Sequence, residues 1–229
     1  MQDVAGGKCQ RLMILTPPSH GLTALLKYFL AYLRERNALN RKNAPLWYAT
    51  SSTESAQRVA GQALALSDIG NQGILATAAG HPITGYAFHT AIVDSPYPNA
   101  DSASYTEYRE WVNDWFDNDV ATRKHKPESP IVVAGSRYHW GDLMGNLIGT
   151  RSDANLSPWH VVYLPIFGGF PLPRYLQESC DKFGTTVEID DREKGEILCP
   201  SFFTLNDLSR MRLQMGEEAW QSQWELDPL

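Results

Sequence analysis

The sequence lacks the features that mark membrane-spanning, secreted and disulfide-bonded proteins. It has no run of about 18 apolar residues, so it predicts no transmembrane helix. Residues 1–8 lack the apolar core of a signal peptide, so none is expected. The three cysteines, Cys9, Cys180 and Cys199, are an odd number, and their spacing fits no metal-binding motif. Reduced thiols in a cytosolic protein are therefore the expected state.

Positive charge is also scarce. The chain has 20 lysines and arginines against 26 aspartates and glutamates, which gives a formal net charge of −6 and a pI near 5.5. A protein that coats DNA without sequence preference needs a positive surface, so any DNA contact must be confined to a local patch. With 229 residues, 43% of them apolar, the chain has the composition of one compact domain with a sizeable core.

Apolar runs and helical periodicities alternate along the chain. The predicted strands are 11–15, 45–50, two short strands within 70–88, 90–93, 131–134 and 159–167. The predicted helices are 22–36, 53–66, 102–123, 140–148, 205–215 and 217–224, whereas 168–199 shows little pattern. Buried parallel strands read as continuous apolar runs. The alternation therefore predicts an α/β fold with a central, mostly parallel sheet that helices cover on both faces.

The segment between the first strand and the first long helix has the layout of a phosphate-binding loop. The backbone N–H groups of such loops surround phosphate at a helix N-terminus, in the pattern G-x-x-x-x-G-K-[ST]. Residues 16–23 read TPPSHGLT, so the glycine (Gly21) and the hydroxyl (Thr23) are present, but Leu22 stands at the lysine position. Taken alone, such a stretch is more often an ordinary turn than a nucleotide site.

Two further positions follow apolar strands. Asp94 ends the run TAIVD, where an aspartate of a P-loop enzyme holds Mg²⁺ directly or through water. Ser136 and Arg137 follow the run IVVAG, where a sensor residue would face the γ-phosphate. Each of these residues also fits an ordinary strand end. Because ligands of open parallel sheets bind at the carboxyl ends of the strands, these positions and the loop are expected to meet there.

The order of these motifs resembles the ATPase domain of bacteriophage terminase large subunits. In that family a strand leads into Pro-Pro-Arg-His-Gly-Lys-Ser, to which residues 11–23 are similar. Residues 83–96 resemble its Walker B region, and residues 132–143 (VVAGSRYHWGDL) resemble its coupling motif, in which Thr-Arg-Trp-His-x-x-Asp-Leu is common. Residues 159–165 and 200–223 resemble the strand and closing helices that follow. The resemblance is collinear and covers nearly the whole chain.

The resemblance implies a P-loop NTPase-type three-layer sandwich, with one domain over residues 1–229 and closing helices at about 200–229. The family's nuclease domain would follow residue 229, where this chain stops. The implied function is that of a viral DNA-packaging motor in the cytoplasm of a bacterial host, with ATP and Mg²⁺ as cofactors. The implied partners are double-stranded DNA, a portal ring, a small terminase subunit and further copies of the chain, without a membrane.

The resemblance also implies roles for individual residues. Thr23 and Asp94 would hold Mg²⁺, and Ser95 and Arg137 occupy catalytic positions. The residues at nucleotide-contacting positions are Ser19, His20, Gly21, Leu22, Thr23 and Ser136.

Several positions depart from the family in ways that weaken hydrolysis. Leu22 replaces the lysine that neutralises phosphate charge, and Ser19 replaces an arginine whose stabilisation of the transition state can be worth roughly a thousandfold in rate. Ser95 replaces the acidic residue that orients the attacking water, and a serine hydroxyl is a poor base near neutral pH. Tyr86 also stands where the family often has arginine.

Three hypotheses remain open from the sequence. The first is a packaging ATPase, active or slow, in which Lys8, Lys27 or Arg137 supplies the missing positive charge. The second is a degenerate terminase-like domain that binds nucleotide or other motor subunits without hydrolysis. The third is a scaffold that keeps the fold alone and regulates packaging. The missing nuclease domain and the lost catalytic groups favour the last two.

Overall fold

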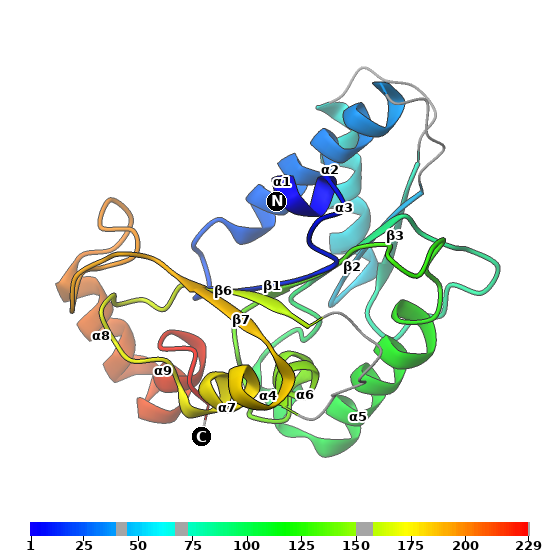
Figure 1. The fold of residues 1–229 in the computed structure, drawn as a ribbon. Coiled ribbons are helices and arrows are strands. Elements are labelled where there is room, and N and C mark those ends of the chain that lie inside the picture. Colours follow the sequence, from blue (N-terminus) through cyan, green and yellow to red (C-terminus); the bar gives the residue numbers. More distant parts are fainter. Residues whose placement is uncertain (40–44, 67–72, 150–157, 229) are drawn as a thin grey trace.

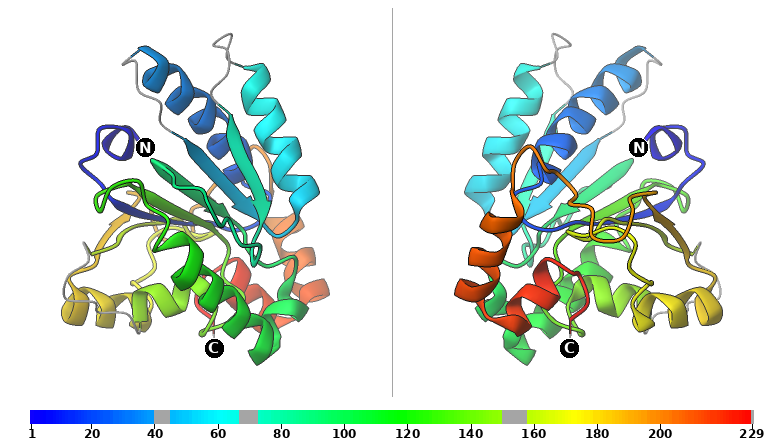
Figure 2. Two further views of the ribbon diagram at one scale, coloured as in Figure 1. Left: turned by 90° about the vertical axis from the view of Figure 1, so that its right-hand side faces the viewer. Right: turned by 90° about the vertical axis from the view of Figure 1, so that its left-hand side faces the viewer.

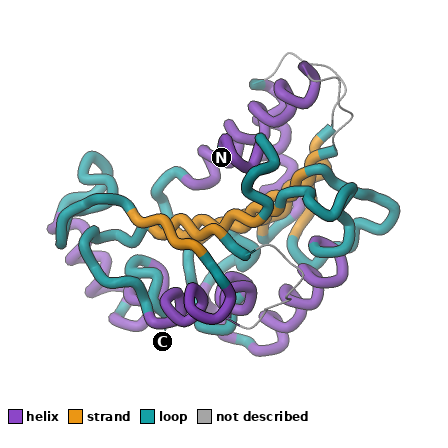
Figure 3. The backbone as a smooth tube through the Cα atoms, viewed as in Figure 1, coloured by secondary structure: helices purple, strands orange, loops and turns teal. Residues whose placement is uncertain are grey.

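A parallel β-sheet forms the centre of the molecule in the computed structural model, which describes residues 1–39, 45–66, 73–149 and 158–228. The sheet has seven strands in the order β3-β2-β4-β5-β1-β6-β7, and every pairing between neighbours is parallel. Figure 3 shows the strands as one layer between two layers of helices. The strands are β1 Arg11–Leu15, β2 Leu46–Thr50, β3 Ile74–Ala78, β4 Thr90–Asp94, β5 Ile131–Gly135, β6 His160–Tyr163 and β7 Thr186–Ile189.

Helices cover both faces of this sheet (Figure 1), which confirms the predicted α/β three-layer sandwich of the P-loop type. One face carries α1 Gln2–Ala5, α2 Leu22–Leu39 and α3 Thr53–Ala65, and Figure 2 shows α2 and α3 side by side. The other face carries α4 Ala100–Ser104, α5 Thr106–Trp115, a π-helical turn Phe116–Val120, α6 Leu143–Gly149 and α7 Arg174–Phe183. Two closing helices, α8 Leu205–Met215 and α9 Glu217–Gln223, follow at the C-terminal end.

Alternation along the strands divides the buried side chains between two cores. Leu12 and Tyr48 face the α1–α3 layer, whereas their neighbours Met13 and Trp47 face the α4–α7 layer. Strands β1, β2, β4 and β5 are buried at every position, as the continuous apolar runs predicted. Helix α3 begins at a capping serine, because the Ser52 side chain accepts a hydrogen bond from the Ser55 N–H (3.2 Å).

The structure corrects three predicted boundaries. The helix predicted at 102–123 is interrupted, because Tyr105 adopts an extended conformation between α4 and α5. The helix predicted from residue 140 begins at Leu143, because the Asp142 carboxylate accepts backbone N–H groups on both sides of it. Within residues 73–88 the structure has one strand, β3, where two were predicted; residues 70–72 lie outside the described part.

Two elements within residues 168–199 were missed. Helix α7 does carry a helical pattern, with Leu176, Cys180 and Phe183 at helical spacing, but it is short and rich in charged residues, and the prediction passed over it. Strand β7 lies at the sheet edge and is mostly exposed, so it contains no continuous apolar run. Both depend on tertiary contacts: β7 pairs with β6, and the Ser179 hydroxyl donates to the Ile148 carbonyl (2.7 Å).

Candidate functional site

The loop between β1 and α2 wraps around a small cavity at the carboxyl ends of β1, β4 and β5. Its first residue is fixed to the neighbouring strand, since the Thr16 N–H donates to the Gly135 carbonyl (3.2 Å). The loop then reverses direction through left-handed conformations at Ser19 (φ 64°) and Gly21 (φ 78°). Such a conformation is free for glycine but costs a serine on the order of 1 kcal/mol. The enclosed volume is about 200 Å³.

Most residues that the sequence assigned to nucleotide binding line this cavity together. They come from the loop, from the first turn of α2 and from the ends of β4 and β5. The assigned residues found here are Ser19, His20, Gly21, Leu22, Thr23, Ser95 and Ser136. Asp94 lies beneath the cavity, bonded to Thr23, and Arg137 is the one assigned residue that points elsewhere.

Asp94 is the buried anchor of the site. Its side chain is only 1% exposed, and its carboxylate accepts hydrogen bonds from Thr23 Oγ1 (2.8 Å) and from Ser95 Oγ (3.1 Å). The Thr23 hydroxyl donates its hydrogen bond to Asp94, so the lone pairs of Thr23 Oγ1 remain available to a ligand in the cavity. A magnesium ion that kept most of its waters would find these oxygens suitable as ligands. Thr23 and Asp94 are thus close enough for the metal-holding role that the sequence assigned to them.

Tyr48 is a member of this cluster that the sequence did not reveal. Its hydroxyl, from β2, donates to Asp94 Oδ2 over 2.6 Å in the protein interior. Burial, and then the negative charge of Asp94, raise the pKa of Tyr48 far above its ordinary value, so the hydroxyl remains a donor. In the sequence, the one indication of this role is a tyrosine within an apolar run. The run does not predict which carboxylate accepts the hydrogen bond from that tyrosine.

Close packing joins Ser95 to the end of β5. Ser95 adopts a left-handed conformation (φ 48°) directly after Asp94. A Cβ on Gly135 would lie 3.2 Å from Ser95 Oγ, and the φ of Gly135 is 152°, so this position favours glycine on both counts. Ser95 is consequently held at the cavity wall.

The two residues after β5 point in different directions. The Ser136 hydroxyl donates to the Thr16 carbonyl (3.0 Å) and lines the loop cavity. The guanidinium of Arg137 is buried in an ion pair with Asp142, with Nε 3.0 Å from both carboxylate oxygens, and it lies over the Tyr175 ring at 4.6 Å. The structure therefore brings Ser136 to the loop but directs Arg137 away from it.

No lysine or arginine is among the residues that line the loop cavity in the described part of the chain. Leu22 contributes a half-buried aliphatic side chain at the lysine position. Of the replacement cations considered from the sequence, Lys27 lies over the Tyr28 ring at 4.9 Å, and Lys8 lines a different cavity. Arg137 is paired with Asp142. The cavity therefore offers hydroxyl and backbone groups to an anion, but no formal positive charge.

The segments that flank the closing helices pack against the loop through His20. The His20 ring contacts Phe203 (ring centroids 5.1 Å apart) and Trp224 (5.7 Å), and its Nδ1 is 2.8 Å from the Pro18 carbonyl oxygen. Because a carbonyl only accepts, Nδ1 carries the proton in this tautomer. Burial lowers the pKa of His20, so the neutral imidazole is favoured. His20 thus serves as a packing contact between the loop and the C-terminal segment.

The sequence matches no known protein-family model, and none of the curated proteins is significantly similar to it. None of the helices in the described ranges is both long and apolar enough to cross a membrane. The described residues also contain no cluster of three or more histidine, cysteine or acidic side chains that could hold a metal ion by itself.

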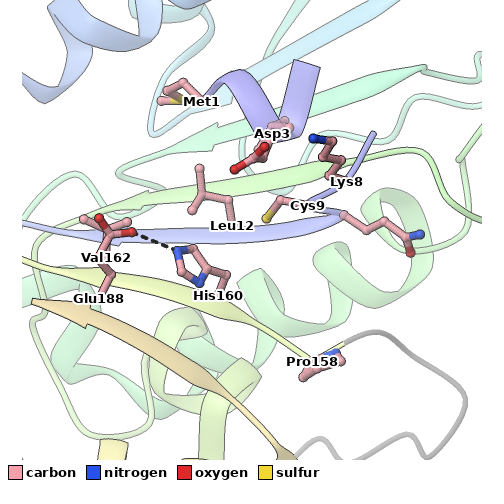
Figure 4. Close-up of a pocket in the computed structure, with 11 residues that line it drawn as sticks. Met1, Asp3, Lys8, Cys9, Leu12, Pro158, His160, Val162 and Glu188 are labelled. Atoms are coloured by element: carbon pink, nitrogen blue, oxygen red, sulfur yellow. Dashed lines mark hydrogen bonds and ion pairs between the residues drawn. The ribbon is translucent and has the colours of Figure 1, made fainter. Parts of the chain in front are cut away.

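A separate cavity of about 510 Å³ lies between α1 and the start of β6 (Figure 4). His160 lines this cavity, with Nε2 3.2 Å from Glu188 Oε2 (Figure 4). Its Nδ1 lies 2.8 Å from Thr186 Oγ1. Cys9 is close by, and burial raises the pKa of its thiol, so the unreactive protonated form is favoured. Of the residues considered in the sequence analysis, Lys8 lies here, and none of the nucleotide-contacting, catalytic or metal-holding positions does. The cavity also adjoins the amino end of β6, whereas parallel sheets bind ligands at the carboxyl end.

Proposed function

We propose that this chain is a terminase large-subunit-like P-loop domain of a viral DNA-packaging motor, and that it is impaired in ATP hydrolysis. The observation that carries the proposal is the Thr23–Asp94 hydrogen bond beneath a phosphate-loop cavity that no cationic side chain lines. The hydrogen bond preserves the architecture of a Mg²⁺–nucleotide site. The neutral cavity removes the charge that makes such a site bind triphosphate tightly.

The remaining groups have definite roles if nucleotide binds. ATP with Mg²⁺ would supply the phosphoryl group whose transfer to water drives the motors that the chain resembles. Gly21 and the neighbouring backbone N–H groups would hold phosphate oxygens at the start of α2. Thr23 and Asp94 would hold the metal, and Ser136 would lie beside the terminal phosphate.

Affinity and turnover are both reduced by the substitutions. A hydrogen bond to a charged group contributes roughly 1.5–3 kcal/mol, so the loss of a lysine contact at Leu22 weakens binding by about tenfold to a hundredfold. Hydrolysis loses more, because phosphoryl transfer depends on positioned positive charge and on an oriented water. Ser95 at the cavity wall binds a water molecule but removes its proton poorly.

A second candidate function is a non-catalytic scaffold or regulator that binds motor partners without nucleotide. Two observations favour it. The cavity of about 200 Å³ is smaller than the roughly 300–1,000 Å³ of typical ligand pockets. The Asp94 carboxylate is already occupied by the hydroxyls of Thr23, Tyr48 and Ser95. In either reading the proposed partners are double-stranded DNA, a portal ring, a small terminase subunit and copies of the chain, in a bacterial host's cytoplasm.

Calorimetric titration with Mg-ATP tests the proposal. The parent chain is compared with a Leu22→Lys, Ser95→Asp double variant, and with Leu25→Lys as a control that places the same lysine outside the cavity. We expect weak or undetectable heat from the parent and the control, and micromolar binding by the double variant. Micromolar binding with turnover by the parent would contradict the proposal. Absence of binding by all three would favour the scaffold.

A further inference from the structure

Residues 203–224, the closing unit, contain α8 and α9 and have a small core of their own. In this core Leu208, Trp220 and Trp224 are buried with Ile166, separately from the two cores beside the sheet. The two helices lie side by side (Figure 1). Cooperative units of a protein often coincide with such separately packed motifs, so the closing unit can loosen without unfolding of the sheet.

His20 joins the phosphate loop to this unit. Its ring contacts Phe203, before α8, and Trp224, after α9, with centroids 5.1 Å and 5.7 Å away. Phe203 and Trp224 also contact each other (5.5 Å), so the three rings form a closed triangle. Nε2 of His20 is buried and has no hydrogen-bond partner among the described residues, so packing alone holds the ring on that side.

The backbone on either side of His20 has a conformation that needs support. Ser19 and Gly21 both have a positive φ, 64° and 78°. Residues other than glycine seldom adopt this conformation, and it persists where the surrounding structure fixes it. The hydrogen bond from His20 to the Pro18 carbonyl lies within the loop and moves with it. The ring triangle, by contrast, holds the turn from outside the loop.

The two ends of the loop are fixed independently of the closing unit. The Thr16 N–H donates to the Gly135 carbonyl (3.2 Å), and the Thr23 hydroxyl donates to Asp94 (2.8 Å). The turn between these ends lines the cavity. A phosphate-binding loop must direct several N–H groups at one point, so the shape of this turn controls how well the cavity accepts an anion.

We propose that the closing unit regulates the phosphate loop through His20. While Phe203 and Trp224 hold the His20 ring, the loop keeps its turned conformation; when these rings withdraw, the loop becomes mobile. The coupling is reciprocal, because a contact that stabilises both segments is lost by both when either one loosens. The consequence for anion binding rests on the proposed function, whereas the coupling between the two segments does not.

Backbone NMR order parameters test the coupling from the side of the closing unit. Phe203→Ala removes one ring of the triangle, and Leu213→Ala, at a side chain of α8 that is 85% exposed, is the matched control. We expect the order parameters of Ser19 and Gly21 to fall from about 0.85 to below about 0.6 in Phe203→Ala and to stay unchanged in the control. Loop order parameters that Phe203→Ala leaves unchanged would overturn the proposal.

His20→Ala tests the coupling from the side of the loop. The Trp224 N–H donates to the Trp220 carbonyl (2.9 Å), so hydrogen exchange of the Trp224 amide reports on the closing unit. We expect this exchange to become faster by roughly tenfold or more, while the Ile92 amide in β4 exchanges at the rate of the parent. An unchanged rate at Trp224 would overturn the proposal. An equal acceleration at Ile92 would also overturn it, because the loss would then be global.

Titration with pyrophosphate distinguishes this proposal from the proposed function. In the parent, binding should shift the NMR signals of the Gly21 amide and of the Trp224 indole N–H together. Shifts at Gly21 without shifts at Trp224 would overturn the regulation of the loop by the closing unit. Shifts at neither position would contradict phosphate binding by the loop, and the two variants then decide the coupling.

Discussion

Removal of a single hydroxyl from the interior should measurably destabilise this protein. The Tyr48 hydroxyl donates over 2.6 Å to Asp94, and both side chains are at most 1% exposed. Tyr48→Phe keeps the ring in its core position but removes this donor. Among the described residues, the hydroxyls of Thr23 and Ser95 then remain as donors to the Asp94 carboxylate. The buried carboxylate loses its shortest hydrogen bond and gains no water in exchange.

The magnitude follows from the charge on the acceptor. A hydrogen bond to a charged group contributes roughly 1.5–3 kcal/mol, about twice the contribution of a neutral bond. We therefore expect Tyr48→Phe to lower the free energy of unfolding by about 2 kcal/mol. For a domain of this size, a loss of that magnitude corresponds to a decrease in Tm of about 4–8 °C.

Equilibrium urea unfolding, followed by tryptophan fluorescence and circular dichroism, measures this change. Tyr138→Phe is the matched control, because the Tyr138 hydroxyl makes no hydrogen bond in the described structure. The same substitution made in an Asp94→Asn background should cost less, since the acceptor is then neutral. A loss below about 0.5 kcal/mol for Tyr48→Phe, or an equal loss in both backgrounds, would refute the reasoning.

The other predictions concern stability at four further positions. Burial lowers the pKa of His20 below 6.5, so below that pH the unfolded chain binds more protons than the folded chain. The free energy of unfolding should therefore fall as the pH decreases from about 7 to 5. His20→Leu should flatten this slope in urea titrations. A Cβ on Gly145 would lie 2.0 Å from the Trp140 carbonyl oxygen, so Gly145→Ala should lower the free energy of unfolding by about 1–3 kcal/mol. A Cβ on Gly61 in α3 has no described neighbour within 4 Å, so Gly61→Ala should raise the free energy of unfolding by about 0.5–1 kcal/mol. Asn113→Leu removes a buried acceptor that has no partner among the described residues, so it should raise the urea midpoint. A decrease would mean that the Asn113 side chain is hydrogen-bonded in solution.

The sequence by itself determined the features that depend on local pattern. Continuous apolar runs marked the central strands, since strands buried on both faces have no polar side to display. The loop from Thr16 to Thr23 and the aspartate at the end of β4 were also readable, because strand ends and helix starts have local signals. Since parallel strands share one carboxyl edge, the sequence also predicted that Thr23 and Asp94 would lie close together, and they do.

Only the tertiary structure decided which side chains complete the site. Tyr48 reaches Asp94 because β2 lies beside β4 in the sheet, and nothing local to either strand specifies that adjacency. Arg137 follows Ser136 directly, yet packing against Asp142 and Tyr175 turns it away from the loop. The sequence gives the type of residue at each position. The direction of a long side chain depends on the partners that folding brings near it.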